Sequence, residues 1–251
     1  MEKRSNAMND NSMIYGTRAI IEAIKSGKEI EKVLLQKDVR NELTSEMVGL
    51  IKDYNFPIVK VPVEKLNRIT KKNHQGSIAF VSPINYTSVE HMISSAYEKG
   101  ENPFVLILDR VTDVRNFGAI SRTAECAGLH GIIIPSRGSA LINSDAVKTS
   151  AGALNYIPVA RSENLKDVIN YLKESGLFVV GCTEKTETKF YDLDLNCPLA
   201  IIMGAEEDGI SEAYLKMVNA KGKLPVKGKI ESLNVSVAAG VAIFEALRQR
   251  S

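Results

Sequence analysis

The spacing of apolar residues predicts alternating helices and strands in the first third of the chain. Ile20, Ala23 and Ile24 share one face of a helix, for which Thr17 is the expected N-cap and Gly27 the expected end. Apolar spacing then predicts two more helices and three strands. They are a strand at 32–35, a helix that presents Leu43, Met47, Leu50 and Ile51 on one face, a strand at 57–61, a helix at 63–69 and a strand at 77–81. This order of elements is typical of a compact α/β unit.

The rest of the chain contains short apolar runs rich in β-branched residues. The runs are 104–108, 131–134, 177–180 and 199–203, and helical stretches at 89–97, 119–127, 165–172 and 233–247 separate or follow them. Apolar runs of this length suit strands that are buried on both faces. The sequence therefore predicts an α/β fold with a doubly wound parallel sheet for this part.

A connector separates the two patterns. Residues 82–87, Ser-Pro-Ile-Asn-Tyr-Thr, combine a proline with polar side chains, as segments between domains commonly do. The length of 251 residues is compatible with two modest domains. We therefore expect a small α/β domain at 12–83, a linker with the first helix at 84–99, and a larger domain at 100–251. The polar residues 1–12 include a Ser-Asn-Ala run before Met8 that resembles a remnant of cloning, and we exclude them from the fold.

Composition excludes several classes of protein. Hydrophobic residues at 44% and charged residues at 25% are typical of a folded globular chain and not of a disordered or fibrous one. No apolar run is long enough for a membrane-spanning helix, and the polar N-terminus lacks the apolar stretch of a signal peptide. Cys126, Cys182 and Cys197 lie far apart and form no CxxC pair. These observations predict a cytoplasmic protein with reduced thiols.

Charge is divided unevenly between the two parts of the chain. The formal net charge of the whole chain is only +2, but residues 1–83 hold 14 basic and 10 acidic side chains, a surplus of +4. The densest basic patch is the loop 71–76, Lys-Lys-Asn-His-Gln-Gly, in which the glycine permits close approach. The surplus suits either a face that contacts phosphate or an ordinary solvated surface. His74 by itself is more often a structural residue than a functional one.

Motifs for several common kinds of active site are absent from the sequence. The chain contains no GxGxxG or GxxxxGK[ST] glycine fingerprint and no convincing GxSxG elbow. His74, His91 and His130 are scattered without the spacing of metal ligands. A metallohydrolase, a serine hydrolase and a nucleotide site of the usual type are therefore disfavoured, and no metal is expected.

Polar residues instead gather in three segments after predicted strands, where open α/β sheets place their ligands. In the first segment, 108–124, Asn116 is the expected cap of the next helix and Arg122 lies about two turns into it. In the second, 201–211, an apolar strand ends in an acidic loop between two glycines, which favours a sulfonium or a ribose over a phosphate. The third, 224–240, is an irregular loop that enters a helix of small residues.

Each of these segments also has a purely structural interpretation. Arg122 would then be a solvated helix arginine, and 201–211 a polar turn before a helix that starts near Ser211. In the third segment, Ser232 or Asn234 would be a plain N-cap, and the small residues would serve a close helix–helix contact or a dimer interface. These small residues are Ser236, Ala239, Gly240 and Ala242.

Together and in this order, the three segments resemble the signature motifs of the SPOUT-class RNA 2′-O-ribose methyltransferases, the TrmH or SpoU family. The matching runs are NFGAISRTAECAG, IIMGAEEDGIS and LPVKGKIESLNVSVAAGVAIFEAL, within which SLNVSVA is very specific. The first part of the chain, with NHQG before a strand, is similar to the small substrate-binding domain of the branch that methylates a guanosine in bacterial 23S rRNA. Two positions depart from the family pattern: Val114 replaces a frequent proline, and Glu207-Asp208 replaces a pair that often contains glycine.

The resemblance implies a SPOUT α/β-knot methyltransferase domain, with a deep trefoil knot at its C-terminal end, preceded by a small α/β RNA substrate-binding domain. It also implies a homodimer through the knotted domain, chemistry without a metal, and S-adenosyl-L-methionine as cofactor. The residues that would bind this cofactor are Thr183, Met203, Gly204, Gly209, Leu224, Val226, Ser232 and Leu233. Those that would contact RNA are Arg18, Lys71, Lys72, His74, Gln75, Arg115 and Arg122.

The resemblance further implies a catalytic set. Its members are Arg122, Asn116, Glu206, Ser232 and Asn234. Arg122 follows Asn116 by six residues, as the catalytic arginine of the family follows its asparagine. Because arginine stays protonated in proteins, we expect Arg122 to position the ribose or its phosphate and to stabilise the developing alkoxide. The other four would orient the arginine and the ribose.

The resulting hypothesis is methyl transfer to the 2′-hydroxyl of a guanosine in 23S rRNA. A tRNA ribose methyltransferase of the same family is the near alternative, and an RNA-binding protein of this fold without turnover is an alternative of another class. The five catalytic-type residues together argue against the inactive alternative, because a binding module has no need of all of them. The separate basic N-terminal part disfavours tRNA, since it suits a folded rRNA target.

Overall fold

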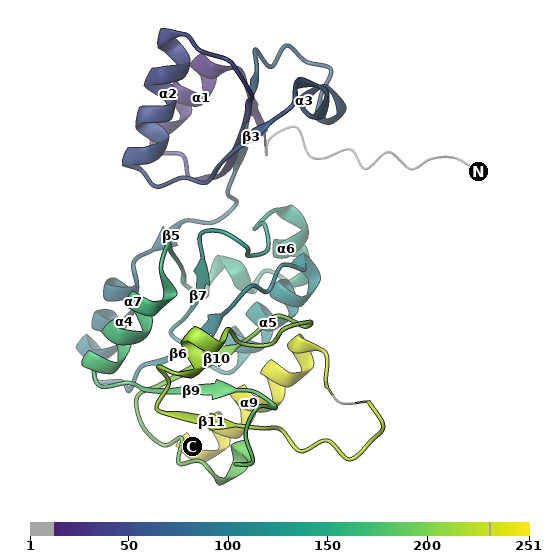
Figure 1. The fold of residues 1–251 in the computed structure, drawn as a ribbon. Helices are drawn as coiled ribbons and strands as arrows, with labels where there is room; N and C mark the ends of the chain where they lie inside the picture. Colours follow the sequence, from purple (N-terminus) through teal and green to yellow (C-terminus); the bar gives the residue numbers. More distant parts are fainter. Residues whose placement is uncertain (1–12, 231) are drawn as a thin grey trace. The chain divides into compact units, whose positions relative to one another are not determined.

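The chain folds into two units. The computed structural model describes residues 13–230 and 232–251, so the stretch expected to be a cloning remnant lies outside the described residues. The smaller unit comprises the described residues up to Asn85 together with Ile142–Ser144, and the larger unit comprises Tyr86–Leu141 and Asp145–Ser251 (Figure 1).

The smaller unit is a four-stranded sheet with helices on both faces. The strands lie in the order β1 (Met13–Tyr15), β4 (Ser77–Val81), β2 (Ile30–Gln36) and β3 (Ile58–Val61). Only β2 and β3 run parallel. The helices are α1 (Thr17–Lys25), α2 (Glu42–Asp53) and α3 (Val63–Ile69). Apolar side chains of α1 and α2 form one core against the sheet, and Leu66 of α3 belongs to a second core with Leu34 and Ile78. The α/β unit expected from the sequence is present.

One predicted cap in this unit is wrong. Thr17 is the first residue of α1, and the cap position is held by Gly16, whose φ of +88° places it in the left-handed region. Thr17 is buried, and its hydroxyl forms a 3.0 Å hydrogen bond with the hydroxyl of Ser77. The threonine oxygen is therefore used to join α1 to β4 and is not available to the helix N-terminus.

The larger unit is built on a seven-stranded sheet in which all neighbouring strands run parallel. The strands lie in the order β11 (Ala220–Gly222), β9 (Phe178–Cys182), β10 (Leu199–Met203), β6 (Phe104–Leu108), β7 (Gly131–Pro135), β8 (Val159–Ser162) and β5 (Tyr86–Thr87). The helices are α4 (Val89–Glu98), α5 (Val114–Cys126), α6 (Ser144–Thr149), α7 (Leu165–Glu174), α8 (Glu212–Leu215) and α9 (Val235–Arg250). The predicted α/β class with a parallel sheet is confirmed.

Four short strands were not expected from the sequence: the three-residue β1 of the smaller unit, and β5, β8 and β11 of the larger one. β5 lies inside the predicted connector, where its two residues pair with β8. β8 and β11 are only four and three residues long. Segments this short carry too few apolar positions to show a period, and their pairing depends on the longer strands beside them.

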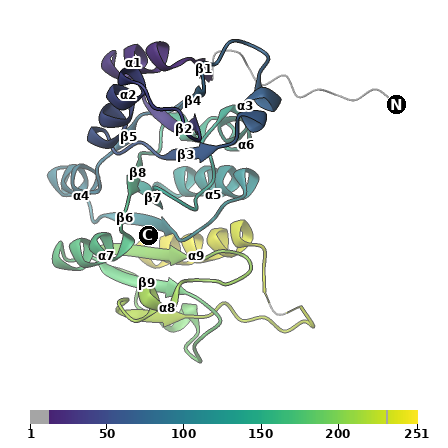
Figure 2. The ribbon, with the colours of Figure 1, turned by 45° about the horizontal axis from the view of Figure 1, so that its top comes forward.

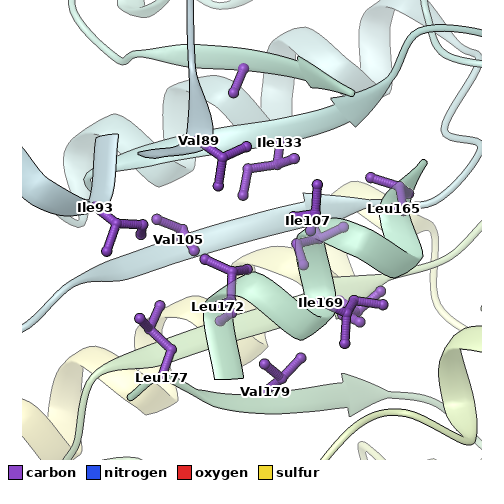
Figure 3. Close-up of a cluster of buried hydrophobic side chains, with 14 of the residues drawn as sticks. Val89, Ile93, Val105, Ile107, Ile133, Leu165, Ile169, Leu172, Leu177 and Val179 are labelled. Atoms are coloured by element: carbon purple, nitrogen blue, oxygen red, sulfur yellow. The ribbon is translucent and has the colours of Figure 1, made fainter. Parts of the chain in front are cut away.

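Helices cover both faces of the larger sheet (Figure 2). Alternate residues of each strand point to opposite faces, so Val105 and Ile107 of β6 lie in the core with α4 and α7. Figure 3 shows Ile93 of α4 and Leu172 of α7 beside these strand residues. On the opposite face α5 packs against α9, and α9 contacts β10. The sheet is thus buried on both sides, which explains its continuous apolar strands.

The buried centre of β10 provides a stability prediction. Ile201 is 0% exposed, so Ile201→Ala leaves a cavity and lowers the free energy of unfolding of the larger unit by about 2–5 kcal/mol. Ile230 is 76% exposed, and the same substitution there is expected to change the free energy by less than about 0.5 kcal/mol. Chemical denaturation of both variants measures the difference. Equal effects of the two substitutions would contradict the described packing.

Candidate active site

Four parallel strands of the larger unit direct their carboxyl ends to one edge of the sheet. In the register of the sheet, Met203 lies opposite Leu108, and Gly222 lies opposite Cys182. β10 pairs with both β6 and β9, although these strands are far apart in the sequence. Loops that follow neighbouring parallel strands meet at the same edge. The three polar segments of the sequence are therefore brought together here.

One side chain from each polar segment takes part in a hydrogen-bonded cluster. Oε1 of Glu206 accepts hydrogen bonds from Nδ2 of Asn116 at 3.0 Å and from Nδ2 of Asn234 at 2.7 Å. Nδ2 of Asn234 also donates to Oδ1 of Asn116 at 3.1 Å. Hydrogen bonds to an ionised carboxylate are shorter and stronger than those between neutral groups. We call these three residues the Glu206 cluster.

The expectation that Asn116 caps α5 is wrong. Asp113 caps the helix, because its Oδ1 accepts from the backbone N–H groups of Arg115 at 2.9 Å and Asn116 at 2.8 Å. The helix begins at Val114, five residues earlier than expected, and aspartate is as good an N-cap as asparagine. The Asn116 amide is therefore free of a capping role and can bind Glu206.

Asn234 has two roles at once. It is the N-cap of α9, and its Oδ1 accepts from the backbone N–H of Ser236 at 3.0 Å and from the Ser236 hydroxyl at 2.6 Å. Its Nδ2 bonds Asn116 and Glu206. The capping interpretation of Asn234 is thus confirmed, and it holds alongside membership of the Glu206 cluster.

A cavity of about 290 Å³ lies against this cluster, since Glu206 is part of its lining. All eight residues of the expected cofactor set line it: Thr183, Met203, Gly204, Gly209, Leu224, Val226, Ser232 and Leu233. The expected cofactor set did not include the remaining lining residues, among which Glu206 was expected in the catalytic set; they are Cys182, Glu184, Ala205, Glu206, Glu207, Val235 and Ala238. These residues either lie close in the sequence to a member of the expected cofactor set or belong to the first turn of α9. No lysine or arginine occurs among the described lining residues.

The floor of the cavity depends on a very close turn after β10. A Cβ atom on Gly204 would lie 2.1 Å from the carbonyl carbon of Gly209. The backbones of Ala205 and Gly209 exchange hydrogen bonds of 3.2 and 3.0 Å, which closes the loop on itself. A residue other than glycine at position 204 would therefore force this loop open.

The end of β9 and the loop after it contribute Cys182, Thr183 and Glu184 to the cavity lining. Thr183 is buried, and its backbone N–H donates to the carbonyl oxygen of Gly222 at 2.9 Å. Burial raises the pKa of the neighbouring Cys182 thiol to about 12. The thiol is therefore protonated at neutral pH and does not act as a nucleophile there.

The structure separates the remaining catalytic-type residues. Ser232 is exposed and lines the cavity. Arg122 is also exposed, but it lies in α5 outside the cavity lining, and within the described residues no hydrogen bond or ion pair holds it. A single chain thus gathers Asn116, Glu206, Asn234 and Ser232 around the cavity and leaves Arg122 apart.

The expected RNA-contacting residues of the smaller unit have two kinds of environment. Arg18, Lys71, Lys72 and Gln75 are exposed. His74 is buried, and both of its ring nitrogens are used: Nδ1 accepts from the backbone N–H of Gly76 at 3.0 Å, and Nε2 is 2.9 Å from Oδ1 of Asn67. The ring therefore shapes the 71–76 loop from within. In the larger unit, Arg115 is exposed in the first turn of α5.

Three general features of the described residues complete the picture of the chain. Across residues 13–230 and 232–251, no three or more His, Cys, Asp or Glu side chains are grouped so as to hold a metal ion. The helices in these ranges are all too short or too polar to cross a membrane. The three cysteines are free thiols.

Comparison with known proteins identifies both parts of the chain. The model of the SpoU rRNA methylase family matches residues 103–244, more than half of the chain. The model of the RNA 2′-O ribose methyltransferase substrate-binding domain matches residues 13–87.

Curated relatives match over almost the full length. YacO of Bacillus subtilis, assigned to the TrmH family of tRNA/rRNA methyltransferases, is 36% identical over 238 residues, which are 95% of this chain and 96% of the relative. A Staphylococcus aureus protein assigned to the same family is 34% identical over 241 residues, with 96% and 97% of the two chains covered.

Solved structures share the fold. The SpoU methyltransferase AviRb from Streptomyces viridochromogenes, in complex with AdoMet, has a TM-score of 0.61 at 21% identity and covers 95% of this chain and 90% of its own. An AdoMet-bound rRNA methyltransferase from Sinorhizobium meliloti has a TM-score of 0.59 at 24% identity, with 94% and 87% covered. The TrmH/SpoU tRNA-modifying enzyme of A. aeolicus has a TM-score of 0.54 at 26% identity, with 64% and 83% covered.

These matches confirm the SPOUT α/β-knot class and the order of domains that the motifs implied. The chain belongs to the SpoU, or TrmH, family of RNA methyltransferases, with a substrate-binding domain followed by the methyltransferase domain.

Proposed function

We propose that this enzyme transfers a methyl group from S-adenosyl-L-methionine to the ribose 2′-hydroxyl of a guanosine in 23S rRNA, in the cytoplasm. The observation that carries the proposal is the Glu206 cluster at the wall of the cavity, because it places hydrogen-bonding groups beside a space for a cofactor. The rRNA methylase family model and the bound AdoMet in two solved family members support it.

The cavity lining fits this cofactor. Leu224, Leu233 and Met203 offer apolar surface for an adenine ring, and Thr183 with the glycine backbone offers hydrogen-bonding groups. The carboxylates in the lining, with no cation among the described lining residues, favour a positively charged sulfonium over a phosphate. When bound, S-adenosyl-L-methionine supplies a methyl group that its charged sulfur already activates for displacement.

The protein itself holds the ribose and stabilises the negative charge that develops on the ribose 2′-oxygen. Glu206 is fixed through Oε1 by two amides, which leaves Oε2 to accept a hydrogen bond from a ribose hydroxyl. Ser232, at the cavity, orients the same sugar. The guanidinium of Arg122 positions the ribose or its phosphate and stabilises the negative charge that develops on the 2′-oxygen. The hydroxyl proton passes to water or to a neighbouring group.

The placement of Arg122 is explained by a homodimer through the methyltransferase domain. One face of α9 packs on α5, but Val237 and Phe244, two turns apart on the helix, are 52% and 49% exposed. Apolar side chains repeated along one helix face are typical of an interaction surface. A second copy bound to α9 lies next to α5, so Arg122 stands at the interface and reaches the ribose there.

The exposed basic residues of the smaller unit provide the RNA contacts in this proposal. Arg18, Lys71 and Lys72 are positioned for phosphates by their exposure, whereas His74 supports the loop that carries the lysines. A tRNA substrate is the second candidate, which the tRNA-modifying structural neighbour favours.

The substrate prediction is tested with labelled methyl donor. Unmodified 23S rRNA and unmodified total tRNA are incubated with the enzyme and labelled S-adenosyl-L-methionine, and the modified nucleotide is mapped. We expect incorporation at the 2′-oxygen of one guanosine in 23S rRNA, because the separate basic domain suits a folded target. Label in tRNA alone would replace the rRNA proposal with the tRNA candidate, and label in neither would contradict methyl transfer to these RNAs.

Arg122 is tested by Arg122→Ala. Loss of a group that stabilises developing charge is expected to lower kcat by about 10²–10³-fold, while the Kd for S-adenosylhomocysteine stays near the wild-type value. The matched control is Lys166→Ala, which removes an exposed cation from α7. Turnover of the Arg122 variant close to that of the control would exclude Arg122 from catalysis.

The dimer is tested by Phe244→Glu. A charge in the middle of an apolar interface is expected to convert a dimer into a monomer in sedimentation equilibrium and to abolish turnover. Tyr156 is 78% exposed elsewhere in the larger unit, so Tyr156→Glu is the matched control and leaves the dimer intact. A Phe244→Glu variant that remains dimeric would place the interface elsewhere.

A further inference from the structure

A buried carboxylate, Asp109, pairs with the partly exposed Arg110 next to the Glu206 cluster, and neither residue is part of the expected site. Asp109 is the first residue after β6, and only 2% of it is exposed. Its Oδ2 accepts from the backbone N–H of Ser211 at 2.8 Å and from the Ser211 hydroxyl at 2.7 Å. Arg110 donates from Nε to Oδ1 at 3.1 Å and from Nη2 to Oδ2 at 3.3 Å. The buried carboxylate is thus fully supplied with donors.

Arg110 extends this pair into the loop after β10. Its Nη1 donates to Oδ2 of Asp208 at 3.2 Å, and its Nη2 donates to the carbonyl oxygen of Gly209 at 3.1 Å. The backbone of Arg110 has a φ of +57°, in the left-handed region that residues other than glycine seldom adopt. Such a conformation persists where surrounding contacts compensate for its cost, and the four hydrogen bonds of the guanidinium are contacts of this kind.

Asp109 and Arg110 therefore hold residues 205–211, which we call the acidic loop, at two places. Ser211 is fixed at its end, and Asp208 and Gly209 are fixed in its middle. The loop contains three consecutive carboxylates, from Glu206 to Asp208, which repel one another. A guanidinium in contact with the third offsets part of this repulsion.

The position of the acidic loop determines where Glu206 and part of the cavity lining lie. The loop carries Glu206, and together with Gly204 it forms part of the cavity lining. Because a Cβ on Gly204 would meet Gly209 and because Ala205 and Gly209 are hydrogen-bonded, displacement of Gly209 displaces Gly204 as well. Asp109 and Arg110 themselves are not among the residues that line this cavity.

We propose that Asp109 and Arg110 are positioning residues for methyl transfer. They hold the acidic loop in the position at which Glu206 contacts the ribose and the backbone of Gly204 and Gly209 contacts the cofactor. The proposal rests on the proposed function for its turnover measurement. Its cofactor-affinity measurement needs no RNA, so the two can fail separately.

The main test is Arg110→Gln, which removes the charge and most of the donors. We expect the Kd for S-adenosylhomocysteine to rise about tenfold, because charged hydrogen bonds to the loop are lost. The displaced Glu206 should lower kcat about 10²-fold. The KM for RNA should change much less than kcat, since the exposed basic residues of the smaller unit, which provide the phosphate contacts in the proposed function, are untouched. Arg110→Lys keeps the charge with fewer donors, and we expect it to restore part of both losses.

The matched control is Lys173→Gln. Lys173, like Arg110, is a cation of the larger unit that donates to a backbone carbonyl, here that of Met217, but it is exposed and lies on α7. We expect its Kd and kcat to equal those of the wild type. Thermal unfolding of all variants separates positioning from stability, because loss of stability alone leaves the Kd of the folded protein unchanged.

Defined results would overturn the proposal. A folded Arg110→Gln variant with Kd and kcat both within about twofold of the Lys173→Gln control shows that the pair positions nothing. If Arg110→Gln does not fold, the Ser211→Ala variant tests the proposal instead, because it removes one hydrogen bond to Asp109. We expect its Kd for S-adenosylhomocysteine to rise by less than that of Arg110→Gln. An unchanged Kd would contradict the proposal. If the wild type methylates no RNA, the proposed function fails, and the Kd series still decides the role of the pair.

Discussion

A single carboxylate oxygen joins the three loops on which the active site depends. Oε1 of Glu206 accepts hydrogen bonds from Asn116 and Asn234, and these residues come from segments that are distant in the sequence. Asn234 also caps α9, so the same contact sets the start of the helix that closes the site. Loss of either amide would leave the carboxylate with a single donor and would break its link to one of the other two loops.

The parallel sheet makes this contact possible. β10 lies between β6 and β9, and all three strands end at one edge of the sheet. The loops that follow them therefore start close together, and short side chains can form hydrogen bonds between them. The lining of the cavity is acidic and apolar, and the basic surplus of the sequence lies in the first 83 residues. This separation suits an enzyme that holds a cationic donor in one domain and a polyanionic acceptor with the other.

The sequence was sufficient for the long buried strands and for the residues around the cavity, because apolar runs and the loop motifs are local signals. It was insufficient where a polar side chain had a choice of partners. Asp113 and not Asn116 caps α5, and Thr17 bonds Ser77 and not its own helix. The roles of Asp109 and Arg110 could not be foreseen, since their partners lie about a hundred residues away. Four of the shortest strands, β1, β5, β8 and β11, could not be predicted because they contain too few residues to show a period.

The most direct measurement of the central claim is a crystal structure of the protein with S-adenosylhomocysteine. We expect the ligand to occupy the cavity between Thr183, Gly204 and Leu233, with its sulfur near the Glu206 cluster. A ligand bound elsewhere, or no binding at millimolar concentration, would contradict the claim.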